Sequence, residues 1–127
     1  MSLPEVVPEV VRLQEKFDLF QEHWSPKVVG ELNGQQVKLA KISGEFVWHS
    51  HEHEDELFLV TKGTLLMRFR DGERRIGVGE FIVVPRGVEH LPVAETPEVW
   101  MLMFEPAGTL NTGNVVNERT VAEPEHL

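Results

Sequence analysis

From residue 27 onward the sequence divides into short segments in which apolar and polar residues alternate. These segments are rich in Val, Ile, Leu and Phe, and turn signals such as Asn33-Gly34 and Asp71-Gly72 separate them. Nine short strands at intervals of about eight to twelve residues predict an all-β, antiparallel sandwich or barrel. The expected strands are 27–32, 35–42, 45–51, 56–60, 64–70, 73–79, 80–85, 90–94 and 98–106.

The two ends of the chain have other patterns. Between Val10 and Phe20, apolar residues fall at helical spacing, which predicts a short amphipathic helix. From Gly108 onward the chain is polar and has little periodicity, which predicts an irregular extension with a frayed end. We therefore expect an N-terminal helical segment (1–23), a β-barrel domain (24–107) and an irregular C-terminal extension (108–127).

Composition narrows the possible functions. The chain has 127 residues, the size of one domain, with a net charge of -9 and no cysteine. Because phosphate contacts dominate nucleic-acid affinity, we expect no nucleic-acid partner for so acidic a chain. We also expect no membrane span, since no apolar run is long enough, and a cytoplasmic location, since residues 1–14 lack a signal pattern. Without thiolates, any metal must be held by nitrogen and oxygen ligands.

Residues 48–63, WHSHEHEDELFLVTKG, combine three alternate histidines with four acidic residues. His49 and His51 end a predicted strand two positions apart, so both imidazoles project from one face. Glu56 has the wrong parity for a continuous strand, so the polar EHED at 52–55 must break it. If Glu56 opens an antiparallel returning strand, its carboxylate comes back to the two imidazoles.

A further ligand candidate follows in the stretch GEFIVVPRGVEH, where a turn at 85–87 precedes His90. If the strand carrying His90 lies beside the first hairpin, the set becomes three histidines and one glutamate. Such a set suits a divalent ion of iron, manganese, zinc, nickel or cobalt. These spacings leave the alternative open, because a His-x-His pair is more often a surface pair and a lone histidine is more often structural.

The combined spacing resembles the two motifs of the cupin superfamily. The first motif corresponds to Gly44, His49-x-His51, Glu56 and Gly63, and the second to Gly79, Pro85-x-Gly87 and His90. Two positions depart from the usual pattern. Four residues, not five, separate Gly44 from His49, and Ala94 stands where the second motif usually has asparagine. Neither departure touches a ligand position.

The resemblance implies a double-stranded β-helix, the cupin jelly-roll barrel, with a short N-terminal helix. It also implies metal ligation by His49, His51, Glu56 and His90. The chain also resembles a group of small single-domain cupins labelled mannose-6-phosphate-isomerase-like, a label that describes fold and not reaction. His53 lies in the polar break and is expected outside the ligand set, and Glu54 and Asp55 are expected to cap or solvate the turn.

If the ligands point inward, alternation predicts a mostly apolar cavity beside the metal. Such a cavity favours a small, partly apolar ligand. Expected interior or wall residues are Val47, Phe58, Val60, Met67, Phe69, Phe81, Val83 and members of the run 99–104. Possible proton carriers are Glu45 and Glu89, and possible anchors for a substrate carboxylate are Lys38, Lys41, Arg68 and Arg86, although ordinary surface roles are more common for all six.

The same alternation turns Trp48, Leu57 and Leu59 outward. An outward apolar stripe must be covered by the N-terminal helix or by a second subunit, and cupins are commonly dimers. We therefore expect a homodimer to which the N-terminal segment contributes.

Three functions fit this pattern. The chain is a small metalloenzyme (oxygenase, isomerase or lyase) acting on a small organic metabolite, a non-catalytic module that binds or senses a small ligand, or a barrel that a metal ion stabilises. The enzyme is favoured slightly, because three histidines and one glutamate leave open positions on a metal. The sequence identifies neither the metal nor the substrate.

Overall fold

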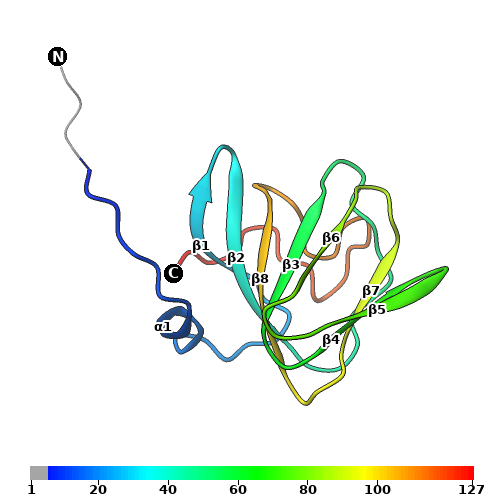
Figure 1. Ribbon diagram of the computed structural model, residues 1–127. Helices are drawn as coiled ribbons and strands as arrows, with labels where there is room; N and C mark the ends of the chain where they lie inside the picture. Colours follow the sequence, from blue (N-terminus) through cyan, green and yellow to red (C-terminus); the bar gives the residue numbers. More distant parts are fainter. Residues whose placement is uncertain (1–5) are drawn as a thin grey trace.

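The structure, a computed structural model, describes residues 6–127, so the first five residues of the expected segment 1–23 lie outside it (Figure 1). One short helix precedes eight strands. The elements are α1 (Leu13–Phe17), β1 (Lys27–Leu32), β2 (Gln35–Ile42), β3 (Glu56–Lys62), β4 (Leu65–Phe69), β5 (Gly72–Ile76), β6 (Phe81–Val84), β7 (His90–Ala94) and β8 (Val99–Pro106).

The strands form two antiparallel sheets, one of five strands in the order β1-β2-β8-β3-β6 and one of three in the order β5-β4-β7. The two sheets enclose an apolar core in the interior of the barrel. Alternate residues of β3 and β8 point into it, as the buried Phe58, Val60, Met101 and Met103 show. The all-β jelly-roll prediction is confirmed.

One predicted strand, 45–51, is absent among the described residues. This segment pairs with β7 only through two isolated bridges, Glu45 with Val93 and His49 with His90. Four positions separate the bridges on one side and three on the other, so the segment carries one extra residue and bulges. The bulge changes the parity that we expected between Glu45 and His49.

The predicted helix is shorter than expected. Residues 10–12 are not helical, and α1 begins at Leu13. The β-branched Val10 and Val11 are poor helix formers, and both are exposed. Phe17 at the end of α1 packs with Phe20 against the outer face of β1, β2 and β8. Within residues 6–127, no helix has both the length and the hydropathy needed to cross a bilayer.

The C-terminal extension is irregular, as expected, but its end is packed and not frayed. The chain returns to β1, where Val28 donates a hydrogen bond to Glu125 O and Leu127 donates one to Val28 O. Leu127 also packs against the apolar cluster under α1. The preceding part of the extension lies across one end of the barrel (Figure 1).

Candidate metal centre

Two segments far apart in the sequence bring four buried side chains together. His49 and His51 lie on the segment before β3, Glu56 opens β3, and His90 opens β7. Two backbone hydrogen bonds clamp these segments, from His49 N to His90 O (3.1 Å) and from His90 N to His49 O (2.9 Å). The downstream histidine therefore reaches the pair because its own backbone is paired with that of His49.

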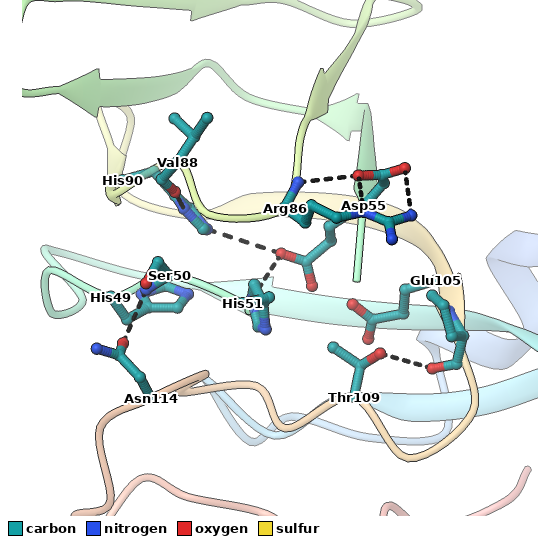
Figure 2. A network of polar contacts seen from close by, with 12 residues as sticks. His49, Ser50, His51, Asp55, Arg86, Val88, His90, Glu105, Thr109 and Asn114 are labelled. Atoms are coloured by element: carbon teal, nitrogen blue, oxygen red, sulfur yellow. Dashed lines mark hydrogen bonds and ion pairs between the residues drawn. The ribbon is translucent and has the colours of Figure 1, made fainter. Parts of the chain in front are cut away.

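The four side chains converge on one point inside the barrel. One ligand atom from each of His49, His51, Glu56 and His90 lies within 4.8 Å of all the others, and every one of these residues is at most 4% exposed. Glu56 Oε1 lies 3.2 Å from His51 Nε2 and 3.7 Å from His90 Nε2, as the dashed lines in Figure 2 trace. The group has the size and the donor types of a divalent-metal site.

The remaining polar atoms of this group support that interpretation. His51 Nε2, His90 Nε2 and both carboxylate oxygens of Glu56 are buried and accept or donate no hydrogen bond among the described residues. Unpaired buried polar atoms are rare and costly, so several of them aimed at one point fit a site for a cation. A divalent cation would satisfy all four atoms.

Backbone carbonyls orient two of the imidazoles. His49 Nδ1 lies 2.9 Å from Val47 O, and His90 Nδ1 lies 3.0 Å from Val88 O. A proton on Nδ1 that bonds a carbonyl leaves Nε2 as the basic nitrogen, the arrangement in which histidine commonly binds a metal. The ring directions therefore fit a cation at the centre of the group.

Burial and neighbouring charges shift the pKa values of His49 and Glu56 toward the protonation states that bind metals. Burial, followed by the neighbouring His90, lowers the pKa of His49 to about 4, so its imidazole is neutral near pH 7. Burial would raise the pKa of Glu56, but the adjacent Glu105, His51 and His90 side chains outweigh it and hold that pKa below its usual value. A neutral imidazole and an ionised carboxylate are the protonation states that bind metals.

A small cavity of about 30 Å³ adjoins the group on the His49 and Glu56 side, with room for one or two water molecules. Its walls are mostly apolar, as predicted, but the expected wall residues are only partly right. The bulge brings Phe46 to the wall in place of Val47, whereas Phe81 and Val83 are exposed on the outside. The cavity is lined by Trp24, Pro26, Ala40, Ile42, Phe46, His49, Glu56, Phe58, Pro92, Met101, Met103 and Asn111.

On the opposite side, His51 borders a polar groove of about 240 Å³ between the 52–54 turn and the C-terminal extension. Ser50 N donates a hydrogen bond to Asn114 Oδ1 (2.9 Å), which Figure 2 shows beside His49. Gly113 has a φ of +56°, and a Cβ there would collide with Ser50 O and lie 3.0 Å from His49 Cδ2. The extension therefore closes one side of the site, a role that the sequence analysis missed.

The acidic break has the structure that we expected at His53 and Asp55 but not at Glu54, whose Oε2 is buried and has no hydrogen-bond partner among the described residues. The His53 side chain is 81% exposed and lies outside the converging group. Asp55 accepts a hydrogen bond from Arg86 N (2.8 Å) and pairs with the Arg86 guanidinium, which lowers the pKa of its carboxyl group. Asp55 therefore ties the break to the 85–87 turn, and Arg86 is engaged on the surface, away from the group.

The other charged candidates also have partners away from the site. Lys41 donates to Phe20 O (2.7 Å) on the outer face of the sheet. Arg68 lies over the ring of Trp48, and Glu89 pairs with Arg70 on the surface. Glu45 is exposed. The interior of the site therefore holds none of the anchors and proton carriers that we considered, with one exception.

The exception is Lys38, which is 2% exposed and lies 2.8 Å from Glu105 Oε1. Sequence reasoning did not single out Glu105. Its alternation with Met101 and Met103 was the available signal, because it places the carboxyl group on the inner face of β8.

Comparison with known proteins supports the fold and the motifs. Residues 35–104, more than half of the chain, match the family described as the cupin domain. The chain is a cupin. A solved cupin-2 domain protein from Shewanella frigidimarina is 47% identical, with a TM-score of 0.74, over 76% of this chain and 94% of that one.

Two other similar proteins have names that state no activity. A solved protein from Neisseria meningitidis is 29% identical, with a TM-score of 0.71, over 78% of this chain and 100% of that one. The uncharacterised protein YdbB of Bacillus subtilis is 38% identical over 63 residues, which are 49% of this chain. This cupin spans only 56% of the length of YdbB.

Proposed function

We propose that this cupin binds a divalent metal ion through His49, His51, Glu56 and His90. The observation that carries the proposal is the convergence of four buried ligand atoms, most of them without any hydrogen-bond partner in the described structure. The donor set suits iron, manganese, zinc, nickel or cobalt, since nitrogen and carboxylate ligands do not choose among them.

We further propose that this cupin is a small metalloenzyme of oxygenase, isomerase or lyase type that uses the bound metal. A bound divalent ion supplies Lewis acidity or an activated water. The cavity with apolar walls beside His49 and Glu56 is only about 30 Å³, so it accepts a small apolar part of a metabolite and not a whole one. The polar groove beside His51 provides a route of approach from solvent.

The metal assignment is tested by replacing His49 and His51 together with alanine. We expect the double variant to lose stoichiometric metal, because two of four ligands are gone, whereas His53→Ala keeps it. Metal analysis of the purified proteins by mass spectrometry measures this. His53 is the matched control, since it shares the stretch but is exposed. Full metal content in the double variant would show that the assignment is wrong.

A non-catalytic binding or sensing role is the second candidate. The observation that favours it is that, among the described residues, only the proposed ligands His49 and Glu56 bring an acid or a base to the cavity wall, to which Glu45 and Glu89 do not contribute. A ligand that raises the melting temperature of the metal-loaded protein, without any product, supports this role. Turnover that a chelator abolishes supports the enzyme.

We also propose a homodimer. The outer face of β3 and β6 presents two apolar rows, in which Leu57 lies opposite Val83 and Leu59 opposite Phe81. Phe81 is 62% exposed, and the extended segment 6–12 carries further exposed valines. Because α1 packs elsewhere, a second copy is the partner we infer for this face.

A further inference from the structure

Three charged side chains lie in a row on the inner face of the five-stranded sheet. Leu57 pairs with Phe104 and Phe58 with Met103, so the same register places Glu105 of β8 beside Glu56 of β3. Lys38 projects from the inner face of β2, the next strand, and its ammonium group lies 2.8 Å from Glu105 Oε1. The row therefore runs from β2 directly to a proposed metal ligand.

All three members are withdrawn from solvent. Lys38, Glu105 and Glu56 are 2%, 1% and 1% exposed. Figure 2 shows Glu105 among the residues around the site, facing the interior beside His51. Burying charge in an apolar core is costly, and a buried ion pair can often be replaced by apolar residues without loss of stability. A contribution to packing is therefore a weak explanation for the presence of the Lys38–Glu105 ion pair in the core.

The contacts of Glu105 are divided between its two oxygens. Oε1 bonds Lys38, while Oε2 is buried and has no hydrogen-bond partner among the described residues. The register of β3 and β8 places Glu105 next to Glu56, and the side chains of both residues lie on the inner face of the sheet. Lys38 also donates to Thr109 O (3.4 Å), which anchors the pair to the C-terminal extension.

We propose that Glu105, held by Lys38, is a positioning residue that keeps the Glu56 carboxylate turned toward the three histidines and so sets the affinity and geometry of the metal site. The inference rests on the proposed function, because it takes Glu56 as a metal ligand. Residues that hold a ligand in place typically change metal affinity by 10- to 100-fold when they are removed. Lys38 contributes a positive charge that offsets one of the two adjacent carboxylates.

The test compares Co²⁺ binding by the full-length wild-type protein and by Glu105→Leu, Glu105→Gln and Lys38→Met/Glu105→Leu. Titrations give the dissociation constant, and the visible absorption of bound Co²⁺ reports its coordination geometry. The double variant removes both charges, so it avoids a buried unpaired ammonium group. Glu95→Gln is the control, since Glu95 pairs with Arg75 on the surface.

We expect Glu105→Leu and the double variant to bind Co²⁺ about 10- to 100-fold more weakly and with an altered spectrum. Glu105→Gln should keep the wild-type spectrum, because its amide both accepts from Lys38 and donates to Glu56. Wild-type affinity and spectrum in the double variant would overturn the positioning role and leave the proposed function standing. If the wild-type protein itself binds no Co²⁺, both fail.

Discussion

At the scale of single residues, His49 is constrained on every side. Its Nδ1 lies by Val47 O, its ring stands edge-on to Phe46 with centroids 5.4 Å apart, and its backbone pairs with His90. These contacts hold the imidazole in one orientation, buried from solvent and with its ring centroid 4.2 Å from that of His90. The consequence is a histidine that resists protonation.

We predict that the metal-free protein loses stability on acidification because of His49. Its pKa is 6.5 when unfolded and about 4 in the fold, so below pH 6.5 the unfolded chain binds a proton that the folded chain does not. The depressed pKa of His49 contributes fully to the free energy of unfolding above pH 6.5. This contribution falls by roughly 3 kcal/mol as the pH drops to about 4. Denaturant unfolding between pH 7 and pH 4 measures it.

His49→Gln is the reference for that experiment, because it keeps a polar side chain and removes the titration. The wild-type protein should lose more unfolding free energy than the variant over this pH range. Parallel curves for the two proteins would show that the pKa of His49 is not depressed in the fold.

At the scale of elements, the C-terminal extension completes the site. Its contacts to Ser50 and to the edge of the His49 ring depend on Gly113, whose left-handed backbone and missing side chain allow the approach. Thr112 is fully buried in the same turn. The extension is therefore part of the wall around the candidate metal centre.

We predict that Gly113→Ala destabilises the protein by about 1–3 kcal/mol, because it adds backbone strain and a collision with Ser50 O. It should also weaken metal binding, since His49 must shift. Thermal unfolding and Co²⁺ titration measure the two effects. Gly108→Ala is the control, with a φ of +87° but no atom within 4 Å of the new Cβ. Equal metal affinity in the two variants would contradict this role of Gly113.

At the scale of the whole molecule, the five-stranded sheet uses both of its faces. The inner face carries the candidate ligand Glu56 and the Lys38–Glu105 pair, and half of the outer face is covered by α1 and Phe20. The other half, over β3 and β6, has no cover from the described residues, and Phe81 and Val83 remain exposed there. This asymmetry is the basis of the proposed dimer.

We predict that Phe81→Asp/Val83→Asp converts the proposed dimer into a folded monomer, because it places charge in the proposed apolar interface while leaving the core intact. Sedimentation velocity measures the mass. Val116→Asp is the control, since Val116 is 80% exposed but lies on the C-terminal extension. The proposed interface would be contradicted if the wild-type protein sediments as a monomer. It would also be contradicted if Val116→Asp dissociates as much as the Phe81→Asp/Val83→Asp variant.

The sequence by itself determined the architecture and the four converging residues. Strand patterns depend on alternation and turn residues, which are local properties, and seven of the eight observed strands lie within two residues of their predicted ends, with β5 ending three residues early. The metal-site candidates could be found because the two cupin motifs keep a fixed spacing. His53 could be set aside because it lies in the polar break between them.

Only the tertiary structure decided what surrounds these residues. The bulge before His49 replaced Val47 with Phe46 at the cavity wall, since one extra residue reverses parity. The approach of Gly113 and the pairing of Lys38 with Glu105 join positions more than 60 residues apart. Such contacts depend on the register between strands and on the path of the C-terminal extension, and no local pattern encodes either.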